Sequence, residues 1–293
     1  MYTFDYHRPK NKREVCELLA EYKDTAKLIA GGTDLLVQMF EQSDRLINIK
    51  NVIDLTHIKD LNYIVEGKNI IRIGAMTTHT EIVESDILKK FVSFLSESSF
   101  LIGSPKIRNT GTVGGNISNA SPAADSVVPL IALNAKVKIL GLSGEREELL
   151  SDFIKNPYDV DLKEDEFLTE IYFDKPKKND YNAFVKLGRR KAMAISRMTV
   201  AVTIRLSESG LFESVTIVPG CIFPVPKRLF SVEKLMIGEK VSDKLLERVS
   251  KEAAKFMIET TGRRWSTPYK EPVLQSLTNR AIRKALHMEV HDE

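Results

Sequence analysis

Cysteine is scarce in this sequence of 293 residues, which contains only Cys16 and Cys221. An iron–sulfur cluster or a four-ligand zinc site needs more ligands than two distant cysteines supply. The five histidines, His79 among them, are scattered without HxH or HxxxH spacing. Each is expected to be a surface residue or to make a local hydrogen bond. The sequence therefore predicts no metal site in this chain.

Long apolar runs are absent as well. No stretch approaches the roughly 18 apolar residues that a membrane-spanning helix requires. The first ten residues, MYTFDYHRPK, lack the apolar core of a signal peptide. Basic and acidic residues number 43 and 40 and are interspersed, so the net charge is only +3. We therefore expect a cytoplasmic protein with neither a membrane nor a nucleic acid as partner.

The chain is long enough for two or three packed units, and its first part mixes strand and helix patterns. Asn11 and Glu14 have the spacing of a helix N-cap and its capping-box partner. Because strands and helices do not alternate strictly, the predicted fold class is α+β. The periodicity predicts strands at 28–30, 45–50, 69–76, 135–141 and 166–173, and helices at 80–103 and 127–133.

A domain boundary is predicted over residues 173–182, where lysines cluster with Pro176, Asn179 and Asp180. The patterns beyond it predict a meander followed by two amphipathic helices. The strands are expected at 181–190, 197–207 and 212–223, and the helices at 244–262 and 273–290. This part reads as an antiparallel sheet with helices packed on one face.

Two glycine-rich loops, 30–34 and 112–116, stand out in a chain with only 15 glycines. Glycine permits positive φ and lets a ligand approach the backbone amides, which together can form an anion nest. Two such loops would cradle a diphosphate, with Thr33 and Thr112 adding hydroxyl donors. Neither loop matches GxGxxG or the P-loop, and tight turns also explain glycine pairs. Asp125 fits either a ribose-hydroxyl acceptor or the N-cap of a helix starting at Ser126.

Four segments, taken in order, resemble the FAD-binding subunit of the molybdenum hydroxylases, the family of xanthine, nicotinate and carbon monoxide dehydrogenases. They are IAGGTDLL, IRIGAMTTHTEI, GSPKIRNTGTVGGNISNASPAAD and FVKLGRR. The resemblance runs over nearly the whole chain. It implies a PCMH-type FAD-binding fold of two α+β subdomains, residues 1–55 and 56–176, followed by a C-terminal domain, residues 180–290, of antiparallel sheet and helices.

The resemblance also implies which residues would contact non-covalently bound FAD. The first loop and its flanks would bind the diphosphate through Leu28, Ile29, Ala30, Gly31, Gly32, Thr33, Asp34 and Leu35. The second loop would bind it through Thr112, Val113, Gly114, Gly115 and Asn116. Asp125 would hold the ribose, while Ile102, Gly103, Leu168 and Lys186 would lie at the isoalloxazine ring.

Lys186 has a physical reason to lie beside a flavin. A fixed cation in a partly dry site stabilises the negative charge of the reduced ring and raises its reduction potential. The lysine alternates with Val185 and Leu187 in a predicted strand. From the residues alone, it can also be an exposed strand lysine.

The function that the resemblance implies is that of an FAD-dependent oxidoreductase subunit of the xanthine dehydrogenase type. In the family, a large subunit carries molybdopterin and a small subunit carries [2Fe–2S] clusters. This chain would take electrons from the clusters and pass them to NAD(P)+ or another acceptor, in the oxidation of an N-heterocycle such as a purine or nicotinate. Two alternatives stay open: a self-contained flavin oxidoreductase of the same fold, and a non-redox nucleotide-binding module.

Overall fold

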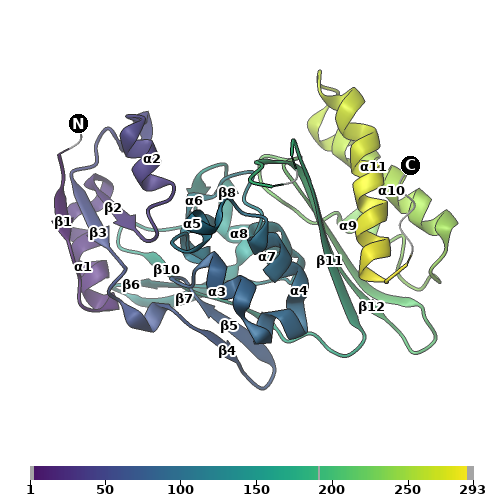
Figure 1. The fold of residues 1–293 in the computed structure, drawn as a ribbon, viewed down its shortest axis with the longest axis horizontal. Helices are drawn as coiled ribbons and strands as arrows, with labels where there is room; N and C mark the ends of the chain where they lie inside the picture. The colour runs from purple at the N-terminus through teal and green to yellow at the C-terminus, as the bar shows by residue number, and fades with distance from the viewer. Residues whose placement is uncertain (1–2, 191, 289–293) are drawn as a thin grey trace.

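The computed structural model describes residues 3–190 and 192–288, and shows three units side by side (Figure 1). A small N-terminal unit lies at the left, a middle unit in the centre, and a C-terminal unit of long strands and helices at the right. The predicted last helix and C-terminal domain extend to residue 290, so their final positions and position 191 lie outside the described residues.

The N-terminal unit is a parallel sheet with strand order β1-β3-β2, formed by Asp5–His7, Asn51–Asp54 and Ala26–Ile29. Helix α1 (Lys12–Tyr22) begins at the predicted cap, because the Asn11 side chain accepts a hydrogen bond from the Glu14 amide at 3.0 Å. Helix α2 (Leu35–Phe40) follows the first glycine loop, and short 3-10 turns span Lys23–Thr25 and Asp44–Leu46.

The strand predicted over 45–50 is wrong. That segment holds the second of these turns, and strand β3 begins only at Asn51. Asn51 is the first residue of β3 that pairs with both Asp5 and Ala26. Ile47, one of the apolar residues that suggested a strand, is 73% exposed. A strand is therefore set here by its ladder partners and not by local apolar content.

The middle unit is built on an antiparallel sheet with strand order β4-β5-β10-β6-β7. Its strands are Ile64–Glu66, Ile70–Gly74, Phe167–Asp174, Lys136–Gly141 and Gly144–Leu149. A small hairpin, β8 (Ile154–Asn156) and β9 (Asp159–Val160), lies beside it. Its helices and one 3-10 turn are η3 (Lys59–Leu61), α3 (His79–Glu84), α4 (Asp86–Phe100), α5 (Pro105–Arg108), α6 (Val113–Asn119), α7 (Val127–Ala132) and α8 (Leu150–Phe153).

The single helix predicted over 80–103 is in fact the two helices α3 and α4. Ser85 lies between them with extended backbone angles, and its hydroxyl accepts a hydrogen bond from the Leu88 amide at 3.3 Å. Serine caps a helix in this way because its side chain replaces a missing backbone acceptor. The apolar periodicity continues through the break, which is why it did not reveal the cap.

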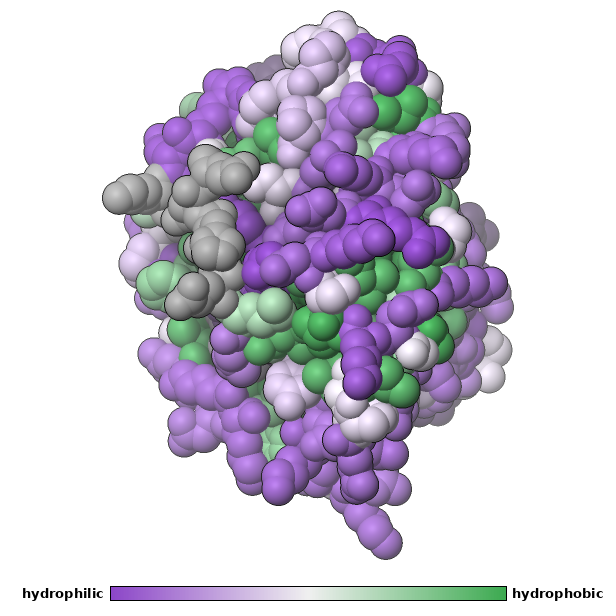
Figure 2. Space-filling model, turned by 90° about the vertical axis from the view of Figure 1, so that its right-hand side faces the viewer, coloured by the Kyte–Doolittle hydropathy of each residue, from purple (hydrophilic) through white to green (hydrophobic). Residues whose placement is uncertain are grey.

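The C-terminal unit is an antiparallel meander of β11 (Asp180–Gly188), β12 (Ser196–Leu206) and β13 (Phe212–Gly220). Helices α10 (Asp243–Thr261) and α11 (Thr267–Ala285) cover one face, and the short α9 (Phe230–Glu233) contacts β13. The opposite face packs against α4 and α7 of the middle unit. Figure 2 looks at the outer side of this unit, where hydrophilic side chains surround an apolar strip.

The α+β prediction is confirmed, and the buried cores show how the units join. Phe167, at the start of β10, belongs to the same buried cluster as Val15 and Ile53 of the N-terminal unit. The next residue, Leu168, belongs to the core of the middle unit. Because neighbouring residues of a strand point to opposite faces, β10 contributes side chains to both cores and so connects the two units. No helix within residues 3–190 and 192–288 is both long and apolar enough to cross a bilayer.

Candidate functional site

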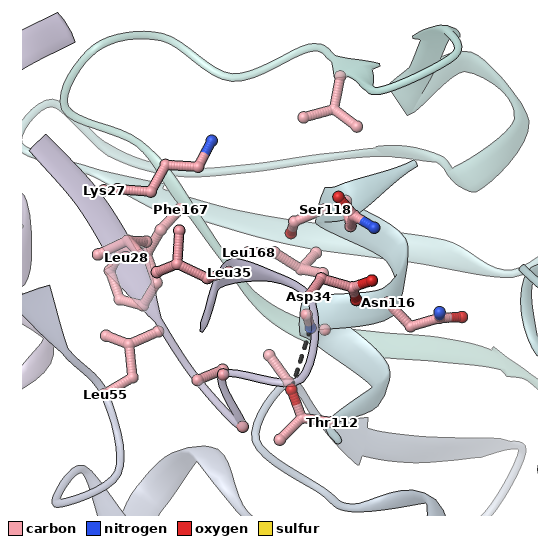
Figure 3. A pocket seen from close by; sticks show the side chains of 18 of the residues that line it. Lys27, Leu28, Asp34, Leu35, Leu55, Thr112, Asn116, Ser118, Phe167 and Leu168 are labelled. Carbon is pink, nitrogen blue, oxygen red and sulfur yellow. Dashed lines mark hydrogen bonds between the residues drawn. The ribbon is translucent and has the colours of Figure 1, made fainter. Parts of the chain in front are cut away.

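A cavity of about 580 Å³ lies between the N-terminal and middle units. Its walls come from β2, the loop leading into α2, helix α6, the β8–β9 hairpin and the start of β10 (Figure 3). This volume is within the range of sites that bind cofactors and other small molecules. Within the part of the chain that is described, no cluster of three or more His, Cys, Asp or Glu side chains could hold a metal ion.

The two glycine loops meet at this cavity. A Cβ atom at position 31 would lie only 1.8 Å from the carbonyl oxygen of Thr110 and 2.9 Å from the Cα of Gly111. A Cβ atom at position 115 would lie 3.8 Å from that of Ala30. Gly31 is therefore required because another stretch of backbone passes directly against it. This close approach brings together loops separated by about 80 positions in the sequence.

The first loop presents free amides. Within the described residues, the N–H groups of residues 31–34 make no hydrogen bond to a protein atom. Gly32 has a φ of +70°, which bends the chain at this point. A run of unpaired amides in such a turn is the arrangement that binds a phosphate oxygen.

The amides of the second loop are not free, whereas the glycine pattern predicted exposed amides in both loops. The four amides of residues 113–116 donate, in order, to Thr77 O at 2.9 Å, Ala75 O at 2.9 Å, Thr112 Oγ1 at 3.1 Å and Thr112 O at 3.0 Å. The first two of these bonds dock α6 against the loop after β5, and the other two are accepted by Thr112, the N-cap of α6, so each of the four amides has a protein partner. The glycines of this loop serve close packing: a Cβ at position 114 would lie 2.6 Å from the Ala75 carbonyl oxygen.

The α6 wall therefore offers side chains to the cavity. Asn116 and Ser118 lie opposite Asp34 of the first loop (Figure 3). The Asn116 side-chain oxygen already accepts a hydrogen bond from the Ser126 hydroxyl at 2.8 Å, so its amide nitrogen is the group left for a ligand. Asp34 makes no side-chain hydrogen bond within the described residues, and desolvation raises the pKa of its carboxyl.

Asp125 and Lys186 form a buried ion pair outside the cavity lining. Lys186 Nζ lies 2.6 Å from Asp125 Oδ2 and donates to the Leu101 carbonyl oxygen at 3.0 Å. The other Asp125 oxygen accepts from the Ser196 hydroxyl at 2.5 Å. Burial raises the pKa of Asp125, and Lys186 opposes that effect. The Asp125 carboxylate does not cap the helix at Ser126, and Lys186 is not an exposed strand lysine.

Most of the residues predicted to contact FAD line this cavity, and five do not. Those in the lining are Leu28, Ala30, Gly31, Gly32, Thr33, Asp34, Leu35, Ile102, Thr112, Gly114, Gly115, Asn116 and Leu168. Those outside it are Ile29, Gly103, Val113, Asp125 and Lys186. Gly103 still lies near the site, because its position contacts Ile107, which lines the cavity.

Several lining residues escaped sequence reasoning. His79 was expected on the surface or in a local hydrogen bond, but it is 2% exposed, and its Nδ1 has no hydrogen-bond partner within the described residues. Burial, with a contribution from Arg108, lowers its pKa to about 4, so the ring is neutral at physiological pH. Its position inside the segment IRIGAMTTHTEI was the signal available. Arg45 and Tyr158 carried no comparable signal, because neither lies in a glycine loop.

Comparisons with known proteins agree with this geometry. Residues 2–176 match the family described as "FAD binding domain in molybdopterin dehydrogenase", and residues 183–285 match "CO dehydrogenase flavoprotein C-terminal domain". The chain is 33% identical to the nicotinate dehydrogenase FAD-subunit of Eubacterium barkeri, with 84% of each chain covered. It is 31% identical to the glyceraldehyde dehydrogenase medium chain of Sulfolobus acidocaldarius, with 96% of this chain and 98% of the relative covered.

A solved structure shows the same fold. A chain of the carbon monoxide dehydrogenase from Hydrogenophaga pseudoflava superposes with a TM-score of 0.90 at 27% identity, and 98% of each chain is covered. The family matches, the relatives and the shared fold all point to the same protein family. The protein belongs to the FAD-binding medium subunits of the molybdenum hydroxylases and is a subunit of an FAD-dependent oxidoreductase.

Proposed function

We propose that this subunit holds FAD non-covalently in the cavity and relays electrons within a heteromeric complex. A small partner subunit with [2Fe–2S] clusters supplies the electrons, and a large partner subunit carries molybdopterin. NAD(P)+ or another acceptor receives the electrons from the flavin. The substrate of the complex is an N-heterocycle such as a purine or nicotinate.

The observation that carries the proposal is the free-amide loop of residues 31–34 facing a cavity. Four backbone N–H groups without protein partners suit the diphosphate of a dinucleotide, which has only acceptor oxygens. The backbone of Thr110 and Gly111 packs directly against Gly31, which supports a nest that is formed before a ligand arrives. A preformed site avoids the entropy cost of ordering a loop on binding.

The walls beyond the loop suit a flavin ring. Ile102, Ile107 and Leu168 give this part of the cavity an aliphatic surface. When bound, FAD accepts electrons singly and donates a hydride. Only two cysteines occur in the chain, which supports iron–sulfur clusters on a partner subunit, and neither lines the cavity, so no thiol is placed there to bond to the flavin.

The names of the relatives bear on the substrate. The relative from Eubacterium barkeri is named for nicotinate, whereas that from Sulfolobus acidocaldarius is named for glyceraldehyde, at 33% and 31% identity. The name of the Eubacterium barkeri relative supports the choice of an N-heterocycle as the substrate.

The test begins with the purified full chain. We expect a flavin absorbance spectrum, about one FAD released per chain on denaturation, and oxidation of NADH or NADPH with an artificial electron acceptor. Co-purification of the native complex should yield the two partner subunits and hydroxylation of an N-heterocycle. A colourless chain that does not take up added FAD would refute the proposal, and hydroxylation by this chain alone would refute its subunit role.

A further inference from the structure

The end of the C-terminal unit beside the buried Lys186–Asp125 pair carries an unbalanced positive charge. Three segments form it: residues 188–197 between β11 and β12, residues 221–227 after β13, and residues 262–270 around the start of α11. Together these segments contain eight lysines and arginines and no aspartate or glutamate. Over the whole chain, by contrast, basic and acidic residues number 43 and 40.

Contacts between the segments place them in one surface. The guanidinium carbon of Arg197 lies 5.9 Å from the centroid of the Tyr269 ring. Lys270 Nζ donates to the Cys221 carbonyl oxygen at 3.1 Å, which joins the second segment to the third. We call the described residues of the three segments, 188–190, 192–197, 221–227 and 262–270, the arginine patch.

Cations of the arginine patch are available to a partner. Arg189 and Arg197 are exposed, and within the described residues neither forms an ion pair with a carboxylate. Arg263 pairs with Glu271, just outside the patch, at 3.6 Å. Cations grouped on one surface without acids between them attract an anionic partner and steer its approach.

Large apolar side chains lie exposed among these cations. Trp265 is 95% exposed, and Ile195, Met193 and Tyr269 are 82%, 56% and 46% exposed. Arginine, tryptophan, tyrosine and methionine are enriched at the centres of protein–protein interfaces, and the first three supply most binding hot spots. The composition of the patch therefore fits a protein with an acidic surface better than a small anion.

The arginine patch is connected to the flavin end of the cavity. Ser196, within the first segment, donates its hydroxyl to Asp125 at 2.5 Å. Asp125 pairs with Lys186, which donates to the Leu101 carbonyl oxygen at 3.0 Å. The next residue, Ile102, lines the cavity. A protein bound at the patch would therefore lie close to the flavin ring.

The kind of interface also follows from the composition. Permanent subunit interfaces are large and apolar at their centres, where charged residues are depleted. The arginine patch instead places single apolar side chains between arginines. This arrangement is typical of a transient encounter, in which opposite charges bring a carrier to the surface and orient it.

We propose that the arginine patch docks a small acidic electron-carrier protein, which takes electrons from the flavin. The inference rests on the proposed function and names the class of its electron acceptor. Two carriers each accept one electron from the reduced flavin, and the protons of the flavin pass to solvent.

The test uses the full chain loaded with FAD and, as probe, an acidic plant-type [2Fe–2S] ferredoxin. Ferredoxin reduced beforehand should dock at the same patch and reduce the flavin, two ferredoxins for each FAD. Stopped-flow absorbance of the flavin gives the second-order rate constant over a series of salt concentrations. We expect this rate constant to fall steeply with salt, because the encounter is steered by charge.

Arg189→Glu combined with Arg197→Glu should lower the rate constant at low salt about tenfold or more and leave the FAD content unchanged. Trp265→Ala should raise the ferredoxin concentration that gives half-maximal rate about tenfold, the scale of one lost hot spot, and keep the salt dependence. Both changes are at exposed positions and should not disturb folding.

Arg248→Glu combined with Arg280→Glu is the matched control, because both arginines are exposed and lie roughly 20 Å of helix from the patch, on α10 and α11. It should keep the wild-type rate. Equal rates in the patch and control variants, or no reduction of bound FAD by ferredoxin, would overturn the docking surface. So would sedimentation with phosphatidylserine vesicles that only the patch variant loses, with its ferredoxin rate unchanged. A wild-type chain that binds no FAD would instead overturn the proposed function, so the two failures are distinguishable.

Discussion

Lys186 Nζ and Asp125 Oδ2 lie 2.6 Å apart, and both side chains are less than a tenth exposed. The pair links β11 of the C-terminal unit to the segment just before α7 of the middle unit. The Ser196 hydroxyl and the Leu101 carbonyl complete its hydrogen bonds. Such a pair contributes little net stability when intact, but removing one partner leaves a buried charge without compensation.

We therefore expect Lys186→Met to destabilise the fold by about 3–5 kcal/mol. Adding Asp125→Asn should recover a large part of that loss, because the orphaned carboxylate is then removed. Urea unfolding of the two single variants and the double variant gives the coupling energy. As a control, Lys255→Met removes a lysine from an exposed pair on α10 and should hardly move the unfolding midpoint. Additive effects at Lys186 and Asp125 would show that the pair is not coupled.

The same pair predicts opposite shifts in the flavin reduction potential. We propose that Lys186 acts on the ring, so Lys186→Met lowers the potential and Asp125→Asn, which leaves the lysine charge uncompensated, raises it. Shifts on the order of tens of millivolts are expected for a charge in a partly buried site. Spectroelectrochemical titration of the FAD-loaded variants measures them. Potentials equal to that of the wild type would assign the pair a purely structural role.

The packing at Gly31 predicts a large effect from one methyl group. In Gly31→Ala, the new Cβ would overlap the Thr110 carbonyl, so one of the two backbones must move. The expected cost is about 3 kcal/mol or more, with loss of bound FAD. Thermal unfolding and the flavin-to-protein absorbance ratio report the two effects. Gly210→Ala, at a turn glycine of φ +77° with no neighbour within 4 Å, should cost only about 1 kcal/mol and keep the flavin.

Gly115 tests the other side of the cavity. Gly115→Val adds a side chain toward Ala30 and the Thr112 hydroxyl, where the two loops approach each other. We expect the purified variant to lose most of its FAD, as measured by flavin released on denaturation. Undiminished flavin content would remove the α6 loop from the site.

Glu166 predicts how stability depends on pH. Hydrogen bonds from Arg146, at 2.8 and 3.0 Å, are the main cause that lowers the Glu166 pKa to about 2. A carboxyl group with a folded pKa below the unfolded value of about 4.3 stabilises the protein above that value. This stabilisation is lost as the pH falls from about 4.3 through 2. Unfolding free energies measured between pH 6 and 3 should therefore fall more in the wild type than in Glu166→Gln.

The control for this prediction is Glu259→Gln on the exposed surface of α10. It should keep the pH dependence of the wild type. A Glu166→Gln variant with that same dependence would show that Glu166 does not contribute to acid sensitivity.

The sequence pattern located the two glycine loops that meet at the cavity, but it did not show which of their amides are hydrogen-bonded within the protein. Gly31 and Gly115 could be singled out because a glycine pair after a strand or at a helix start is a local pattern. The hydrogen bonds of the Val113 and Gly114 amides could not be predicted, since their acceptors Thr77 and Ala75 lie on a loop some 40 positions earlier. The contact between Arg45 and Tyr158, with the guanidinium carbon 3.6 Å from the ring centroid, has no local pattern either, because the two residues meet only once the N-terminal and middle units have packed.

The same distinction explains the errors in secondary structure. Apolar periodicity is local and located the long strands β10 to β13 and helix α10. Ser85 ends one helix and caps the next through a hydroxyl that leaves the periodicity unchanged. Residues 45–50 were strand-like in composition but had no neighbouring strand to pair with.

The C-terminal sheet is buried on both faces, and this affects where the chain can be divided. Phe184, Ala201 and Val218 belong to the same core as Ile73 and Leu95 of the middle unit. A truncation after residue 176 would remove these three side chains and uncover the apolar surfaces of α4 and α7. The fragment would then be prone to aggregate, although a sequence-family boundary falls at that position. Because the middle and C-terminal units share this core, we expect them to unfold in one cooperative transition.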